Sequence, residues 1–166
     1  MRSPSWKISV ESAALGQGLE LALACDLRLA VQGAMLSLDQ VSRGELPWDG
    51  GTQRLPRLLP PGVALDMVLT GRRMSAEEAL AFGLVSAVVP TEALGQRAAE
   101  LAEKIAAMAP IASVYAKEAV LKGLDAPLDQ GVRLEADLAI LLHTSRDRAE
   151  GIGAFLQKRK PRFTGE

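Results

Sequence analysis

The pattern of apolar residues changes at Pro90, and this change limits the folds that the chain can adopt. Before Pro90 the apolar residues form short runs of strand length, several of them separated by glycine. After it, they recur every three or four positions, which is typical of amphipathic helices. The 166 residues are enough for a single core. The sequence therefore predicts an α/β protein whose sheet is confined to the first half.

Three segments of the first half have strand character. The predicted strands are residues 7–13, 27–31 and 34–38, and a buried helix is predicted over residues 19–26. The apolar density of the second and third strands predicts burial on both faces. The glycines and the proline of residues 43–51 predict a loop, followed by a short helix from Thr52 that is interrupted near Pro56.

Capping and breaking residues mark the remaining elements. A helix over 63–69 is predicted to stop at Gly71. Ser75 and Glu78 have the spacing of a capping box and begin a helix that ends at Gly83. The later segments are an apolar run over 84–89 and helices over 92–108, 111–124, 128–143 and 146–158.

Composition excludes several classes of function. The net charge is −1 with mixed signs, which gives no field for nucleic acid or an anionic membrane. A single cysteine, Cys25, and a single histidine, His143, argue against a disulfide framework and against a metal site. No apolar run approaches the roughly 20 residues that span a bilayer, and the first residues lack a secretory signal. We expect a cytoplasmic protein without a membrane partner.

A candidate site begins at Gly16, Gln17 and Gly18, a glycine-rich turn into the first predicted helix. A helix N-terminus presents unpaired N–H groups and the positive end of the dipole, so it can stabilise an oxyanion that forms on a bound carbonyl. Glu20 lies about one helical turn after Gln17, on the same face. Alternatively, the glycines only allow tight packing, and Glu20 is a solvated acid.

The string from Ala14 to Asp26 resembles the pattern A-L-G-G-G-x-E-L-A-L-A-C-D of the enoyl-CoA hydratase/isomerase family, in the crotonase superfamily. The resemblance continues through residues 50–57, 69–73, 75–79, 83–85 and 155–161. It implies a crotonase-like (ClpP/crotonase) core of repeated ββα units over residues 1–90, without the N-terminal part that family members carry. It also implies a helical region over residues 91–166 that forms homotrimers or dimers of trimers.

The resemblance implies an acyl-CoA ligand, no separate cofactor, and hydration or isomerisation of an enoyl-CoA through a stabilised enolate. Gln17 falls at the middle glycine of the family motif, whose N–H is an oxyanion donor. Glu20 matches the first catalytic glutamate. The second glutamate falls at Gln40, whose amide can orient water but cannot accept its proton.

An acid in the following loop could replace the missing glutamate: Asp49, or Glu45 nearby. Equally, Asp49 is a turn residue before Gly50. By the same resemblance, Phe155 and Lys158 match residues that lie near bound CoA, although a solvated face would explain them as well. The run of basic residues over 158–162 gives only weak support for nucleic-acid binding.

Two further interpretations stay open. The chain could be a non-catalytic acyl-CoA-binding or assembly module. The absence of the second glutamate and of the upstream half favours this interpretation. It could also be a fragment of a normal-length enzyme. A sheet without its N-terminal strands would expose an apolar patch, so oligomerisation or instability is expected.

Overall fold

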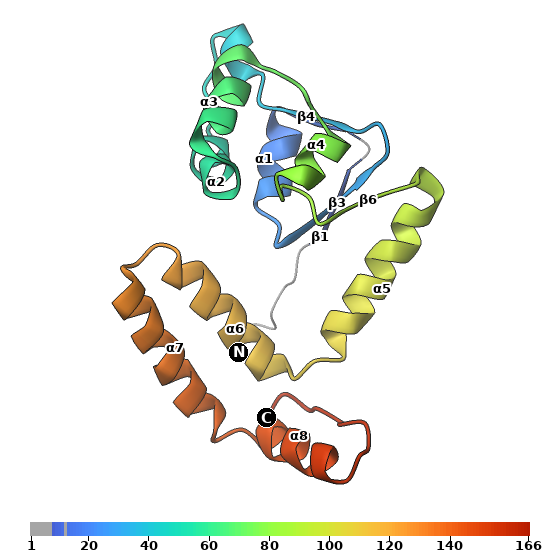
Figure 1. Cartoon of the computed structure of the whole chain (residues 1–166), viewed down its shortest axis with the longest axis vertical. Helices are drawn as coiled ribbons and strands as arrows, with labels where there is room; N and C mark the ends of the chain where they lie inside the picture. Colours follow the sequence, from blue (N-terminus) through green and yellow to red (C-terminus); the bar gives the residue numbers. More distant parts are fainter. Residues whose placement is uncertain (1–7, 12) are drawn as a thin grey trace. The chain divides into compact units, whose positions relative to one another are not determined.

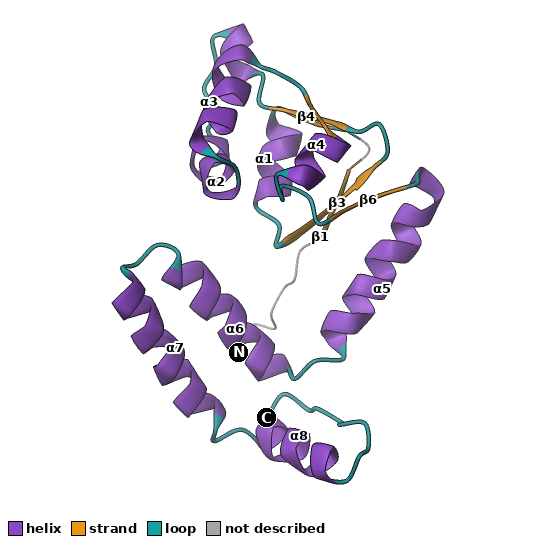
Figure 2. Cartoon of the chain, in the orientation of Figure 1, coloured by secondary structure: helices purple, strands orange, loops and turns teal. Residues whose placement is uncertain are grey.

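The computed structural model describes residues 8–11 and 13–166. These residues form two compact units, one ending at Leu101 and the other running from Ala102 to Glu166. Every strand of the described residues precedes Pro90 (Figure 2), so the predicted α/β class with its sheet in the first half is confirmed. The division into residues 1–90 and 91–166 stays a prediction.

Two three-stranded sheets form the first unit. One has the parallel order β1 (Ile8–Glu11), β3 (Leu27–Val31) and β6 (Ala87–Val89), and the other has the order β2 (Ala14–Leu15), β4 (Met35–Ser37) and β5 (Met74–Ser75). In the second sheet β4 is parallel to β2 and antiparallel to β5. The central strand β3 is buried at four consecutive positions, 28–31, which confirms burial on both of its faces. Lys7 and Ser12, the parts of the first predicted strand around β1, lie outside the described residues.

Four helices and two 3-10 turns complete this unit (Figure 1): α1 (Gln17–Leu23), η1 (Gln40–Arg43), α2 (Gly51–Leu58), α3 (Pro61–Thr70), α4 (Ala76–Ala81) and η2 (Thr91–Ala93). The core is formed by apolar residues of the helices and strands together, among them Leu19, Leu36, Leu55, Met67 and Met74. The capping residues act as predicted. The Glu78 N–H donates to Ser75 Oγ (3.1 Å), and Gly71 ends α3 with a φ of 68°.

The predicted interruption near Pro56 is wrong, because α2 continues through the proline to Leu58. A proline inside a helix removes one backbone hydrogen bond and crowds the preceding turn. Here the flanking residues Leu55 and Leu59 are both buried in the core. Their burial holds the segment helical in spite of the lost bond.

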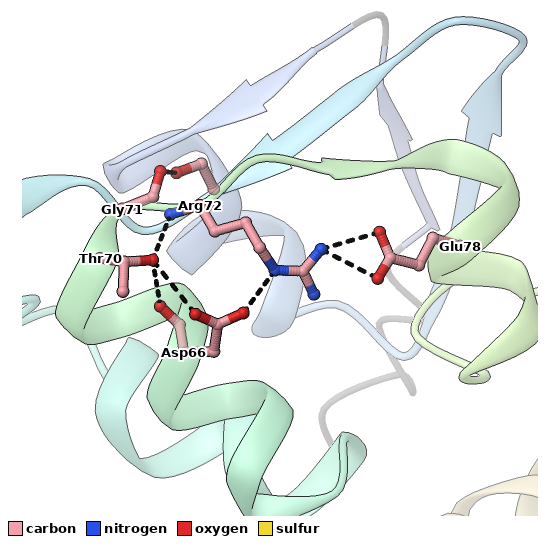
Figure 3. Close-up of polar contacts among 6 residues, drawn as sticks. Asp66, Thr70, Gly71, Arg72 and Glu78 are labelled. Carbon is pink, nitrogen blue, oxygen red and sulfur yellow. Dashed lines mark hydrogen bonds and ion pairs between the residues drawn. The ribbon is translucent and has the colours of Figure 1, made fainter.

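Arg72 joins α3 to α4 (Figure 3). Its Nη1 lies 2.9 Å and 3.0 Å from the two carboxylate oxygens of Glu78. Its Nε lies 2.7 Å from Asp66 Oδ2, an ion pair without the alignment of a hydrogen bond. The hydrogen bond that Arg72 donates to Glu78 is the main reason why the pKa of Arg72 is raised. These contacts connect helices of the scaffold. The turn at Gly16 is held by other residues.

The helix α5 (Leu94–Ala106) runs across the boundary between the units, and the second unit contains α6 (Pro110–Gly123), α7 (Leu128–Leu142) and α8 (Arg146–Leu156). The helices α6 and α7 pack closely where glycines meet, since a Cβ on Gly131 would lie 3.4 Å from the Cα of Gly123. Few side chains of this unit are buried. Large apolar side chains are exposed along it, among them Val120, Leu121, Leu124, Leu128, Ile140, Leu141 and Phe155.

Asp147 anchors the C-terminal segment to α8. Its carboxylate is buried and accepts hydrogen bonds from the backbone N–H groups of Thr164 (2.7 Å) and Gly165 (2.9 Å). Nearby, Glu150 accepts two hydrogen bonds from the Arg159 guanidinium, at 2.6 Å and 2.7 Å, and one from the Arg162 N–H at 2.8 Å. These bonds, with that from Arg159 the largest, lower the pKa of Glu150 to about 2.

We expect Asp147→Ala to destabilise this unit and release residues 164–166. The change leaves donors without their acceptor and a space in a buried site, at a cost of about 1–3 kcal/mol. Urea unfolding followed by circular dichroism measures the loss, and hydrogen exchange at Thr164 and Gly165 reports the release. The control is Asp137→Ala, at an exposed position inside α7, which should change stability by less than about 0.5 kcal/mol. Equal stability of the two variants would contradict the anchoring role.

Candidate active site

The glycine turn that precedes α1 has the geometry of an anion-binding corner. Gly16 has φ 55° and ψ −123°, a conformation that side chains rarely adopt. Its N–H donates to Ser37 O (2.8 Å), and its carbonyl accepts from the N–H groups of Leu19 and Glu20. Among the described residues, no acceptor is assigned to the N–H of Gln17 or of Gly18. Two donors are therefore left at the start of the helix.

Glu20 lies behind this turn, on the buried face of α1, with none of its surface exposed. Three donors converge on its carboxylate. Oε1 accepts from the backbone N–H of Asp49 (2.9 Å) and of Gly51 (2.8 Å), and Oε2 accepts from Gln40 Nε2 (2.9 Å). A buried carboxylate is stable only when its oxygens are satisfied in this way. Oε2 keeps one lone-pair direction for a further partner.

The loop after η1 is shaped to fit this carboxylate. A Cβ on Gly51 would lie 2.8 Å from Glu20 Oε1 and 2.9 Å from its Cγ, so only glycine lets the backbone come this near. Gly50 has a φ of 97° and is the N-cap of α2. The two glycines thus turn the start of α2 toward Glu20, and the positive end of that helix faces the carboxylate.

Gln40 is the side-chain partner of Glu20 and is 3% exposed. Because an ionised carboxylate oxygen can only accept, the amide is oriented with Nε2 toward Glu20. Gln40 Oε1 is then buried with no donor among the described residues. A buried acceptor without a partner costs about 1–3 kcal/mol. The amide therefore holds Glu20 in place and has an unused acceptor of its own.

These residues border a cavity of about 770 Å³ that opens beside the turn. It is lined by Leu15, Gly16, Gln17, Gly18, Asp39, Gln40, Arg43, Glu45, Leu46 and Trp48. Three of them are charged: Arg43 forms ion pairs with Asp39 (3.2 Å) and Glu45 (3.5 Å). The hydrogen bond to Asp39 is the main reason why the pKa of Arg43 is raised. The cavity thus combines the N–H groups of the turn with charged side chains, and Gln40 in its lining contacts the buried carboxylate of Glu20, which is not itself part of the lining.

The family model for enoyl-CoA hydratase/isomerase matches residues 8–166. The chain belongs to this enoyl-CoA hydratase/isomerase family. It is 45% identical to (E)-benzylidenesuccinyl-CoA hydratase of Thauera aromatica. The alignment extends over 163 residues and covers 96% of the chain and 64% of that relative. It is 44% identical to the bovine (Bos taurus) enoyl-CoA hydratase domain-containing protein 2, mitochondrial. This alignment covers 95% of the chain and 55% of that protein.

The family's fold is also present. The crystal structure of enoyl-CoA hydratase from Bacillus anthracis superposes with a TM-score of 0.90 at 46% identity, over 93% of this chain and 60% of that one. The predicted crotonase-like fold is therefore confirmed. The chain spans less than two thirds of the length of each of these three proteins. In the part of the chain that the structure describes, no helix is long and apolar enough to cross a membrane.

Within this member of the enoyl-CoA hydratase/isomerase family, the structure brings together Glu20, Gln40 and the turn from Gly16 to Gly18. Asp49 contributes its backbone N–H to Glu20, while the residue is exposed and is not among those that line the cavity. Glu45, the other acid considered in the loop, does line it.

Phe155 and Lys158 belong to the second unit. Phe155, at the end of α8, is 82% exposed, and Lys158 follows with a φ of 54°. Sequence reasoning did not single out Asp39, Arg43 or Gly51. A signal existed only for Gly51, since a glycine pair before a helix indicates close backbone approach.

Proposed function

We propose that the chain processes an enoyl-CoA thioester, by hydration or isomerisation through a stabilised enolate. The observation that carries this proposal is the fully buried Glu20 carboxylate, held by three donors, behind a turn in which the N–H groups of Gln17 and Gly18 have no acceptor among the described residues. Family membership supports the acyl-CoA ligand. The Gln17 N–H would bind the thioester oxygen, and Glu20 would act as the acid/base.

The chemistry follows from one carboxylate and one oxyanion site. When a proton leaves the carbon next to the thioester, the charge moves to the carbonyl oxygen, where the N–H dipoles stabilise it. Glu20 can take that proton and return it to another carbon, which moves the double bond. In hydration, the water oxygen bonds to C3 as Glu20 takes a proton from the water, and Glu20 then delivers that proton to C2 of the enolate. Both routes need only one proton carrier.

We propose that residues of the second unit bind CoA and form the assembly surface. Phe155 and Lys158 would contact CoA, the lysine through a phosphate. The exposed apolar residues of α6 and α7 support a homo-oligomer, a trimer or a dimer of trimers, in which this surface is covered.

A second candidate function is a non-catalytic acyl-CoA-binding or assembly module. The observation that favours it is Gln40, because an amide stands where the second glutamate is expected and cannot carry a proton. Binding without turnover would be the mark of this alternative.

Calorimetry of the 166-residue chain with crotonyl-CoA and acetyl-CoA tests the proposal, with loss of the enoyl absorbance measured in the same sample. We expect both ligands to bind and the absorbance of crotonyl-CoA to fall. Binding with no loss of absorbance would favour the non-catalytic module. No binding of either thioester would overturn the enzyme and the acyl-CoA-binding module, and would leave assembly as the function of the second candidate.

A further inference from the structure

Trp48 is a large aromatic side chain that the proposed reaction does not use. It belongs to the loop between η1 and α2, lines the cavity beside the Gly16 turn and is 79% exposed. Burial of apolar surface is the main favourable contribution to folding, and an indole as exposed as this one contributes little of it. Most of the indole surface is therefore available to a ligand in the cavity.

The backbone is fixed on both sides of Trp48. The side chain of Pro47 is fully buried. On the other side, the Asp49 N–H donates to Glu20 Oε1 (2.9 Å), and the Asp49 carbonyl accepts from Arg54 Nη1 (2.7 Å). The indole keeps only the rotations about its two side-chain bonds, so its immobilisation on a ligand costs little conformational entropy.

Two further apolar side chains line the cavity with Trp48: Leu15, which is 39% exposed, and Leu46, which is 67% exposed. The same cavity is bordered by Gln17 and Gly18, whose N–H groups form the proposed oxyanion site. Its volume of about 770 Å³ is that of pockets that enclose drug-sized molecules, so it has room for an acyl group larger than the four carbons of crotonate. A thioester bound at the turn can therefore extend its acyl group onto these apolar side chains.

We infer that Trp48 makes the cavity selective for an acyl group that ends in an aromatic ring, over a flexible alkyl chain of similar size. The inference rests on the proposed acyl-CoA function and specifies its ligand class as aryl-substituted acyl thioesters. A planar ring that packs against the indole gains more than its buried area alone provides. It also has fewer bond rotations to lose on binding than an alkyl chain has.

The experiment compares the affinities of 3-phenylpropionyl-CoA and octanoyl-CoA for the 166-residue chain by calorimetry, with butyryl-CoA as a reference for thioester binding. These acyl groups have no double bond, so they cannot be hydrated or isomerised during the measurement. We expect the phenylpropionyl thioester to bind roughly fivefold more tightly than the octanoyl thioester, which is about 1 kcal/mol.

Variants of Trp48 assign this ratio to the indole. In Trp48→Leu, which keeps an apolar side chain and removes the ring, the ratio should fall to about one, whereas Trp48→Phe should keep part of it. The control Leu69→Ala removes an apolar side chain that is 65% exposed on α3, outside the cavity lining, and should keep the wild-type ratio. A wild-type ratio in Trp48→Leu would contradict the role of the indole.

The outcomes separate this inference from the proposed function. Equal affinities of the wild type for the two larger thioesters would overturn the aromatic selectivity and leave the acyl-CoA function standing; a second copy of the chain that covers Trp48 would give this result. Tighter binding of octanoyl-CoA would also overturn it. Failure of all three thioesters to bind would overturn both the selectivity and the acyl-CoA function. The wild-type ratio decides the matter even where Trp48→Leu does not fold.

Discussion

Glu20→Gln is expected to abolish measurable turnover of crotonyl-CoA while leaving the chain folded. General acid–base groups contribute roughly 10²- to 10⁴-fold to rate, and Glu20 is the buried carboxylate that accepts from Gln40 and from the backbone N–H groups of the loop. The fold should survive, because the carbonyl oxygen of the new side chain can still accept from the backbone N–H groups of Asp49 and Gly51. Gln40 can turn over so that its Oε1 accepts from the new amide. Loss of enoyl absorbance measures turnover, and circular dichroism checks the fold.

Two further variants are needed to interpret this result. Glu77→Gln, at an exposed position on α4, changes the same chemical group away from the site and should leave turnover unchanged. Asp49→Asn tests the other acid proposed from the sequence. If Asp49→Asn removed turnover and Glu20→Gln did not, the loop aspartate would be the base, and Glu20 would only support the loop that carries it.

The fold was largely accessible from the sequence because its elements carry local signals. The apolar runs of β3 and β4, the cap at Ser75 and the glycine that ends α3 each depend on neighbouring residues alone. The short strand β5 was not predicted, since two residues carry no period and pair with β4 about 40 positions earlier. The continuity of α2 through Pro56 was missed because it depends on core packing that no local pattern reveals.

Only part of the candidate site could be predicted from the sequence. The motif singled out Glu20, Gln40 and the turn, because the family resemblance predicts roles for them. The donors from Asp49 and Gly51 lie 29 and 31 positions from Glu20, in a loop without periodicity. Their hydrogen bonds to the carboxylate depend on the geometry of the backbone. The unpartnered acceptor on Gln40 likewise follows from three-dimensional hydrogen bonding and has no counterpart in composition.

Gln40→Glu should increase the rate of hydration, because it restores the pair of carboxyls that the family pattern implies for hydratases. With two such groups, one can take the proton of the water while the other supplies a proton to C2. General acid–base catalysis by one more group gives about 10²-fold or more. The measurement is the initial rate of loss of crotonyl-CoA absorbance, with Gln40→Met as the matched variant that has neither amide nor acid.

The same change should lower stability, and the two effects together test the site. The new side chain cannot donate to Glu20 while both are ionised, and two carboxyls at hydrogen-bond distance cannot both be charged without a large penalty, so one of them takes up a proton. We therefore expect Gln40→Glu to be less stable than the wild type in urea at neutral pH and to recover part of the difference at lower pH. A destabilised variant with an unchanged or slower hydration rate would mean that Gln40 is not a displaced acid. The amide would then belong to a site adapted to a single carboxylate, where isomerisation or ligand binding accounts for Glu20 better than hydration does.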